Sequence, residues 1–169
     1  MYFSDTSLDL ARRVVEAATA KGLMVATAES CTGGLIAACL TEVPGASHVF
    51  MRGFVTYANE AKAELLGVPE DALAQFGAVS EEVARAMAEG AAARAGADLA
   101  VSATGIAGPG GATESKPVGL VHMAAARAGG ETLHRKAVFA GDRQAVRAQA
   151  VEAALALLLE QAETAPPPR

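Results

Sequence analysis

The segment TAESCTGG, residues 27–34, places two candidate nucleophiles, Ser30 and Cys31, beside two glycines. It lies between two apolar runs, which is typical of a turn from a strand into a helix. The first backbone N–H groups of a helix lack partners within the helix and favour negative charge. A carbonyl attacked by Ser30 would develop its oxyanion near such donors, and Gly33 and Gly34 would let a substrate approach closely. The alternative is that Ser30 only caps the helix.

Ser30 and Cys31 are not expected to serve the same site. Successive side chains at the end of a strand point in opposite directions, so that one of the two faces a substrate and the other the protein. A free cysteine is commonly buried as a small apolar residue, and we expect this of Cys31 and of Cys39. The two cysteines fit neither a zinc nor a disulfide pattern.

A nucleophilic serine needs a base, and histidine is a poor candidate in this sequence. His48 lies in a loop, and His122 and His134 lie within predicted strands. No G-x-S-x-G elbow surrounds Ser30. A Ser–His–Asp hydrolase is therefore disfavoured.

Lys62 is the other candidate base. It follows the expected helix cap Asn59 by three residues, where the helix dipole favours a neutral amine. Burial would lower its pKa further, and a neutral lysine can deprotonate a serine. The alternative is a solvated Lys62 that pairs with Glu60 or Glu64.

A glycine-rich loop, SATGIAGPGG at residues 102–111, offers hydroxyl and N–H groups for phosphate or sugar oxygens. It is neither a Walker loop nor a dinucleotide fingerprint, because no G-K-[ST] follows and the glycine spacing differs. Arg143, just inside the last predicted helix, could bind an anion at a helix start. By its own pattern it could equally be a surface arginine.

Helices and strands alternate along the first half of the chain, and a hairpin and a helix follow. This order predicts an α/β fold, a single-domain α/β/α sandwich with a mixed sheet. We expect one domain over 1–169, with its core at about 8–160 and a flexible tail at 164–169. The expected helices are 8–20, 33–43, 59–66, 69–77, 80–95 and 142–162, and the expected strands are 23–29, 49–57, 97–105, 118–127 and 132–141.

Helix boundaries are expected at residues with capping side chains or positive φ. The expected N-caps are one of Asp5, Thr6 and Ser7 for the first helix, then Asn59, Ser80 and Asp142, and the expected stops include Gly22 and Gly67. Ligand sites in such sheets gather where strands end. Three strand ends, at 29–30, 57–59 and 102–105, would form one cleft if they are neighbours.

Composition narrows the class of protein. The chain has 169 residues, of which 51% are hydrophobic and 20% charged, so a core can form without metals or disulfides. Its net charge of −5 gives no basic surface for nucleic acid. The acidic N-terminal segment does not resemble a signal peptide, and no apolar run has membrane-spanning length. We expect a cytoplasmic protein in a reducing compartment, and a homodimer as the common state of such domains.

Six blocks in a fixed order carry a resemblance to a known family: TAESCTGGLIA, FVTYANEAK, FGAVSEEVA, SATGIAGPGG, KPVGLV and FAGDR. From about residue 8 to residue 159 the sequence closely resembles the CinA C-terminal domain family. The resemblance implies an amidohydrolase that converts nicotinamide mononucleotide to nicotinic acid mononucleotide and ammonia in pyridine nucleotide salvage. Longer members carry an additional N-terminal domain, and the resemblance implies none of that domain's activities for this sequence.

The resemblance also implies roles for individual residues. It makes Ser30 the nucleophile of an acyl-enzyme mechanism, Lys62 its base, and Tyr57 a group that orients the dyad or the substrate. Ala112 stands where many members have glycine, and its methyl group could narrow the glycine-rich loop. The expected substrate-binding residues are Glu29, Cys31, Thr32, Gly33, Gly34, Asn59, Thr104, Gly105, Gly108 and Arg143.

No cofactor and no metal are expected, because no cluster of Asp, His and Cys has ligand spacing. Two other functions stay open from the sequence. A nucleotide-binding regulatory module would bind the nucleotide without releasing ammonia. A hydrolase of another amide would act on nicotinamide or its riboside and would be indifferent to the loss of Arg143.

Overall fold

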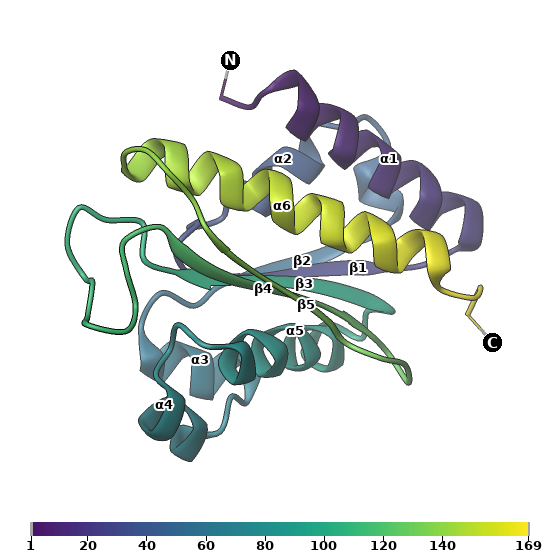
Figure 1. Ribbon diagram of the computed structural model, residues 1–169. Coiled ribbons are helices and arrows are strands. Elements are labelled where there is room, and N and C mark those ends of the chain that lie inside the picture. The colour runs from purple at the N-terminus through teal and green to yellow at the C-terminus, as the bar shows by residue number, and fades with distance from the viewer. Residues whose placement is uncertain (1, 169) are drawn as a thin grey trace.

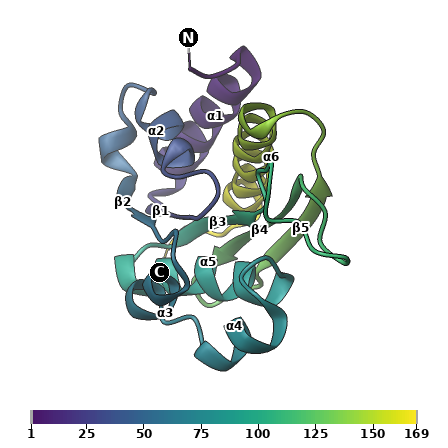
Figure 2. The same ribbon diagram turned by 90° about the vertical axis from the view of Figure 1, so that its left-hand side faces the viewer.

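The computed structural model describes residues 2–168 and places a five-stranded mixed sheet between two layers of helices (Figure 1). Figures 1 and 2 show α1, α2 and α6 on one face of the sheet and α3, α4 and α5 on the other, which confirms the predicted sandwich. The helices are α1 (Asp5–Lys21), α2 (Leu35–Thr41), the 3₁₀ helix η1 (Ala46–His48), α3 (Asn59–Leu66), α4 (Glu70–Phe76), α5 (Glu81–Ala95) and α6 (Arg143–Thr164). The strands are β1 (Val25–Glu29), β2 (Phe50–Val55), β3 (Leu99–Gly105), β4 (Leu120–Arg127) and β5 (Leu133–Val138).

The order of the strands in the sheet is β2-β1-β3-β4-β5. β1 is parallel to both β2 and β3, and β4 is antiparallel to its neighbours β3 and β5. β1 is buried along its whole length, as expected for a parallel strand covered on both faces. The carboxyl ends of β2, β1 and β3 therefore lie side by side at one edge of the sheet.

Hydrogen bonds continue past the ends of these three strands. The N–H of Thr56 donates to the carbonyl of Glu29, and the N–H of Ser30 donates to the carbonyl of Ala103, each at 2.9 Å. The strand ends at 29–30, 57–59 and 102–105 are thus neighbours, which meets the condition on which the sequence placed them in one site. The loop that leaves β3 extends from this edge, at the left of Figure 1.

Two of the predicted N-caps are wrong. α1 begins after Ser4, whose side chain accepts the N–H of Ser7 at 3.0 Å, because Ser4 itself has the extended backbone of a cap. Asp5, Thr6 and Ser7 all lie inside the helix. α3 begins at Asn59 after an extended Ala58 that makes no side-chain cap.

The other predicted boundary residues are confirmed. Ser80 and Asp142 accept the N–H groups of Val83 and Ala145 with their side chains. Gly22 and Gly67 end α1 and α3 in the left-handed conformation.

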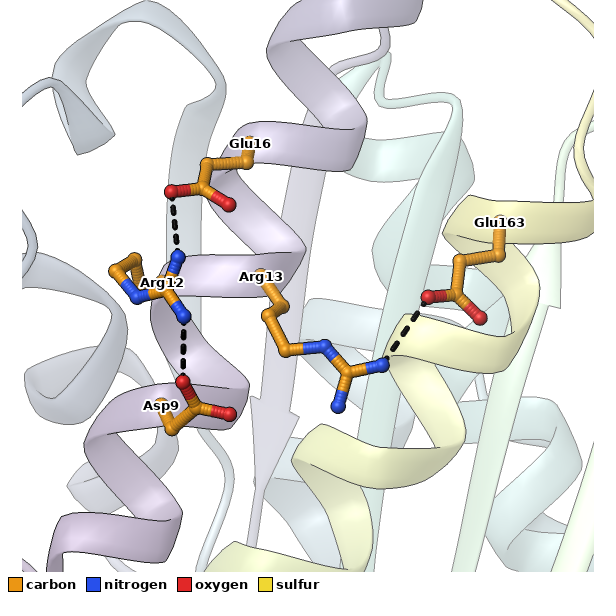
Figure 3. A network of polar contacts seen from close by, with 5 residues as sticks. All are labelled: Asp9, Arg12, Arg13, Glu16 and Glu163. Carbon is orange, nitrogen blue, oxygen red and sulfur yellow. Dashed lines mark hydrogen bonds and ion pairs between the residues drawn. The ribbon is translucent and has the colours of Figure 1, made fainter.

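α1 packs beside α6, and polar contacts join the two helices at their surface. Arg12 bridges Asp9 and Glu16 within α1 at 2.5 and 2.7 Å, and Arg13 reaches Glu163 of α6 at 3.4 Å (Figure 3). Such exposed ion pairs contribute little stability. The apolar side chains of α1 and α6 are buried in one cluster with those of the sheet. Their burial holds this helix layer on the sheet.

Lys21 gives a more specific link between the ends of α1 and α6. Its Nζ donates to the carbonyls of Ala162, Glu163 and Ala165 at 2.6–2.7 Å. Ala165 is buried. The expected tail at 164–169 therefore overlaps ordered structure, since Thr164 still belongs to α6, and Arg169 lies outside the described residues.

Within residues 2–168 no helix is long and apolar enough to span a membrane.

Candidate active site

Ser30 lies in a tight turn between β1 and α2. The N–H of Gly33 donates to the carbonyl of Ser30 at 3.0 Å and closes this turn. Gly33 and Gly34 have φ angles of 60° and 100°, which side-chain-bearing residues rarely adopt. For this reason α2 begins at Leu35, two residues later than the sequence pattern predicts.

Glu29 anchors the start of α2. Its buried carboxylate accepts the N–H groups of Ile36 at 2.8 Å and of Ala37 at 3.0 Å. A carboxylate at a helix N-terminus satisfies unpaired N–H groups and complements the helix dipole. Glu29 was expected to bind substrate, whereas both of its oxygens are engaged with α2, which favours a role in positioning the turn.

Lys62 lies against Ser30. Its Nζ is 3.1 Å from Oγ of Ser30, and it also donates to the carbonyls of Thr56 at 2.8 Å and Tyr57 at 3.1 Å. The side chain is only 1% exposed. The interpretation of Lys62 as a solvated partner of Glu60 or Glu64 is therefore wrong, and no carboxylate of residues 2–168 forms an ion pair with it.

This environment favours a neutral lysine. Burial lowers the pKa of Lys62 from its ordinary value, because the ammonium form loses its hydration. A neutral amine has two N–H bonds and one lone pair. When the N–H bonds point to the carbonyls of Thr56 and Tyr57, the lone pair is left to accept the O–H of Ser30.

Cys31 belongs to the main buried core cluster, which confirms the burial predicted from the sequence. It is 5% exposed, and burial raises the pKa of its thiol to about 11. Its sulfur is therefore a protonated thiol at neutral pH and a poor nucleophile. Cys39 is also buried, as expected.

Arg143 contacts two other predicted parts of the site, Tyr57 after β2 and the glycine-rich loop. Its Nη2 donates to the hydroxyl of Tyr57 at 3.1 Å, and its Nη1 donates to the carbonyl of Gly108 at 2.9 Å. The end of β2, the glycine-rich loop and the start of α6 therefore meet at Arg143. Both Tyr57 and Arg143 are exposed, so a ligand can reach this corner from solvent.

Thr104 lies beside Ser30 on the same face of the sheet. Glu29 pairs with Ala103, and Ser30 and Thr104 come next on the two parallel strands. The Thr104 hydroxyl donates to the carbonyl of Ala78 at 2.8 Å, and the side chain is buried. Thr104 thus fixes the segment before α5 against the end of β3.

The remaining predicted residues occupy different surroundings. Gly105 permits close packing, since a Cβ there would lie 2.6 Å from Cγ2 of Val121. Thr32 is fully buried and its hydroxyl has no partner among residues 2–168. Asn59 and Ala112 are exposed, and the Asn59 side chain makes no cap of α3.

Arg147 also contacts this site, although it was not among the residues expected from the sequence. Its Nε donates to the carbonyl of Cys31 at 3.1 Å and its Nη2 to the carbonyl of Thr32 at 3.3 Å. It follows Arg143 by four residues on α6 and so lies on the same side of the helix. That spacing is the one signal in the sequence that could have indicated it.

His122 on β4 and His134 on β5 form a stacked pair. Nδ1 of His122 lies 2.9 Å from Nε2 of His134, and Nδ1 of His134 lies 3.6 Å from a carboxylate oxygen of Glu81. Burial lowers the pKa of His122 to about 4 and that of His134 in the same direction.

These shifts predict a loss of stability in acid. Both pKa values are lowered on folding, so between about pH 4 and the ordinary value of 6.5 the unfolded chain binds more protons than the folded one. Stability should fall as the pH falls through this window, with His122 contributing at most about 3 kcal/mol. Urea unfolding at several pH values should show a flatter dependence for His122→Gln, whereas His48→Gln at an exposed position should follow the wild type. An equally steep dependence in His122→Gln would contradict this assignment.

No group of three or more His, Cys, Asp and Glu side chains that could hold a metal ion occurs within residues 2–168.

The fold and the buried Ser–Lys contact define an α/β sandwich protein with a candidate hydrolytic site at the ends of its parallel strands. The family model of the CinA C-terminal domain matches residues 7–162, and the chain belongs to this family. Nicotinamide-nucleotide amidohydrolase PncC of Escherichia coli K12 is 54% identical over 154 residues, which are 91% of this chain and 93% of that protein. A CinA-like protein of Akkermansia muciniphila is 58% identical over 138 residues, which cover 82% of this chain but only 33% of that longer protein.

Solved structures agree with this assignment. The competence/damage inducible protein CihA of Agrobacterium tumefaciens superimposes with a TM-score of 0.91 at 50% identity, covering 94% of this chain and 96% of that one. A CinA superfamily protein of Escherichia coli superimposes with a TM-score of 0.88 at 38% identity, covering 94% and 92%.

Proposed function

We propose that this protein hydrolyses the carboxamide of nicotinamide mononucleotide to nicotinic acid mononucleotide and ammonia. The observation that carries the proposal is the contact between Ser30 and a buried lysine that has no acidic partner among residues 2–168. Relatives that align over nearly their whole length are named nicotinamide-nucleotide amidohydrolases, and this supports the choice of substrate.

In the first half-reaction, Lys62 takes the proton of Ser30 while Oγ attacks the carboxamide carbon. The positive pyridinium ring makes this carbon more electrophilic. A C–O bond forms, the C–N bond then breaks, and the nitrogen leaves as ammonia after receiving the proton held by Lys62. General acid–base assistance of this kind contributes about 10²–10⁴-fold.

In the second half-reaction, water replaces the serine. Lys62 takes a proton from water, whose oxygen attacks the ester carbon, and the bond to Oγ breaks as Ser30 regains a proton. The oxyanion in both steps needs N–H donors. The N–H of Cys31 is the candidate, because it donates to no acceptor on another residue within residues 2–168.

The phosphate of the nucleotide is assigned to Arg143. It is exposed beside Tyr57 and the glycine-rich loop, and two of its nitrogens already fix its position. The product would feed pyridine nucleotide salvage. The test of the function is ammonia release from nicotinamide mononucleotide by the wild-type protein, with nicotinamide riboside and nicotinamide compared; nucleotide binding without ammonia release would instead support a regulatory module.

Arg143→Met should lower kcat/KM for nicotinamide mononucleotide by about 10–100-fold, the loss expected for one charge-assisted contact. For nicotinamide riboside, which lacks the phosphate, kcat/KM should change much less. Arg135→Met, which removes an exposed arginine paired with Glu160, is the matched control. Equal losses on both substrates would remove Arg143 from phosphate binding.

A further inference from the structure

A cavity of about 310 Å³ lies between the N-terminal segment and α6. Its apolar wall includes Phe3, Leu35 and Val151, which belong to the main core cluster or pack against it. Neither Ser30 nor Lys62 lines this cavity, so it is separate from the candidate active site. Its volume lies at the lower end of the range for small-molecule sites, which are mostly apolar with a few polar groups.

Arg147 places a positive charge in the wall of this cavity. The side chain is half-buried, and it forms no ion pair with any carboxylate of residues 2–168. Its Nε and Nη2 donate to the carbonyls of Cys31 and Thr32, whereas its Nη1 donates to no described residue. A guanidinium carries five N–H donors and binds most strongly to carboxylates and phosphates. The unpaired charge and the free nitrogen therefore suit an anionic group on a ligand.

Glu152 limits the charge that such a ligand can carry. It lines the same cavity, accepts the hydroxyl of Ser4 at 3.4 Å and is in no ion pair within the described part of the chain. It follows Arg147 by five residues on α6, which is about 7.5 Å along the helix axis. A second negative group on the ligand would be repelled by this carboxylate. A single carboxylate beside Arg147 is therefore favoured over a phosphate or a dicarboxylate.

We propose that this cavity is a binding site for a small molecule with one carboxylate and an apolar body. The carboxylate accepts from Nη1 of Arg147, and the apolar body covers Phe3, Leu35 and Val151. Because the same guanidinium holds the carbonyls of Cys31 and Thr32, a bound ligand contacts the turn after Ser30 through one side chain. The proposal does not rest on the proposed function.

Cyclohexanecarboxylate is the probe, and its binding is followed by NMR of the backbone amides. We expect saturable binding with a dissociation constant on the order of 1 mM, as is usual for a ligand of this size. The amides of Cys31 and Gly33 should shift on binding. Cyclohexylmethanol, which lacks the charge, and trans-1,4-cyclohexanedicarboxylate, which adds a second one, should each bind at least about tenfold more weakly.

Two variants locate the site. Arg147→Met keeps the apolar stem and removes the charge, so affinity should fall about 10–100-fold, the loss expected for a charge-assisted hydrogen bond. Ala148→Phe fills the cavity from an exposed position and leaves Arg147 in place, so it should also abolish binding. Arg135→Met, at an exposed arginine paired with Glu160, is the matched control and should bind like the wild type.

Several results would overturn the proposal. These are no binding to the wild type at about ten times the expected dissociation constant, equal affinity for the alcohol, or wild-type affinity in folded Arg147→Met. If Arg147→Met does not fold, wild-type affinity in Ala148→Phe would overturn it. Displacement of the probe by nicotinic acid mononucleotide would place the probe in the candidate active site instead. None of these measurements needs ammonia release, so failure of this site and failure of the proposed function are distinguishable.

Discussion

Replacing Lys62 with methionine should lower kcat for ammonia release by about 10²–10⁴-fold, the usual contribution of a general base. Methionine is close to lysine in length and needs no hydrogen-bond partner, so the buried site can still be filled. The carbonyls of Thr56 and Tyr57 would lose a donor, yet both belong to the backbone at the end of β2 and keep their places. Lys136→Met, on exposed β5, should keep wild-type activity.

The pH dependence gives the same prediction a second readout. Because burial lowers the pKa of Lys62, wild-type kcat/KM should rise with pH and reach its midpoint below the ordinary lysine value of 10.5. Between the lowered pKa and 10.5 the unfolded chain binds more protons, so stability should also rise with pH across that window. Lys62→Met should lose both dependences. A rise in kcat/KM with the same midpoint in Lys62→Met would show that another group is the base.

Replacing Gly90 with alanine should disrupt the site from a distance. A Cβ at Gly90 of α5 would lie 2.0 Å from the carbonyl oxygen of Leu66, at the end of the helix that carries Lys62. Backbone atoms cannot yield as a flexible side chain can, so α3 must shift. We expect a loss of about 1–3 kcal/mol in unfolding free energy. We also expect kcat to fall at least about tenfold, because catalysis is sensitive to displacements of about 1 Å.

The loss of stability predicted for Gly90→Ala is opposite in sign to the effect of helix propensity alone. In an ordinary helix interior, alanine is more stable than glycine by about 1 kcal/mol. Ala93→Gly, at an exposed position of the same helix, measures that propensity alone and should destabilise without lowering kcat per folded molecule. Urea unfolding and ammonia release of both variants provide the comparison. A stabilised and fully active Gly90→Ala would show that α3 and α5 are not constrained by this contact.

Local patterns predicted the parts of the site that depend on neighbouring residues. The strand-to-helix turn around Ser30, the inward direction of Cys31 and the shared edge of three strands follow from strand alternation and from parallel pairing. The sequence left two alternatives for Lys62: a buried neutral base, or a solvated side chain paired with Glu60 or Glu64. The contacts of Lys62 with Ser30 and Thr56, at the ends of β1 and β2, decided between them.

Other parts could not be read from local patterns because they depend on contacts between distant segments. Arg147 meets the turn at 31–34 only because α6 crosses the sheet beside α2. Glu29 matches a substrate-binding motif, yet it serves the N-terminus of a helix that begins six residues later. The cap of α1 was misplaced since four polar residues in a row, from Ser4 to Ser7, offer equivalent local signals.

The central claim is that Ser30 is the nucleophile in the hydrolysis of nicotinamide mononucleotide. The most direct measurement compares ammonia release by the wild type, Ser30→Ala and Cys31→Ala, with folding checked by circular dichroism. We predict release by the wild type, near-complete loss in folded Ser30→Ala, and retained activity in Cys31→Ala, whose thiol is buried in the core. Equal release by the wild type and Ser30→Ala would contradict the claim.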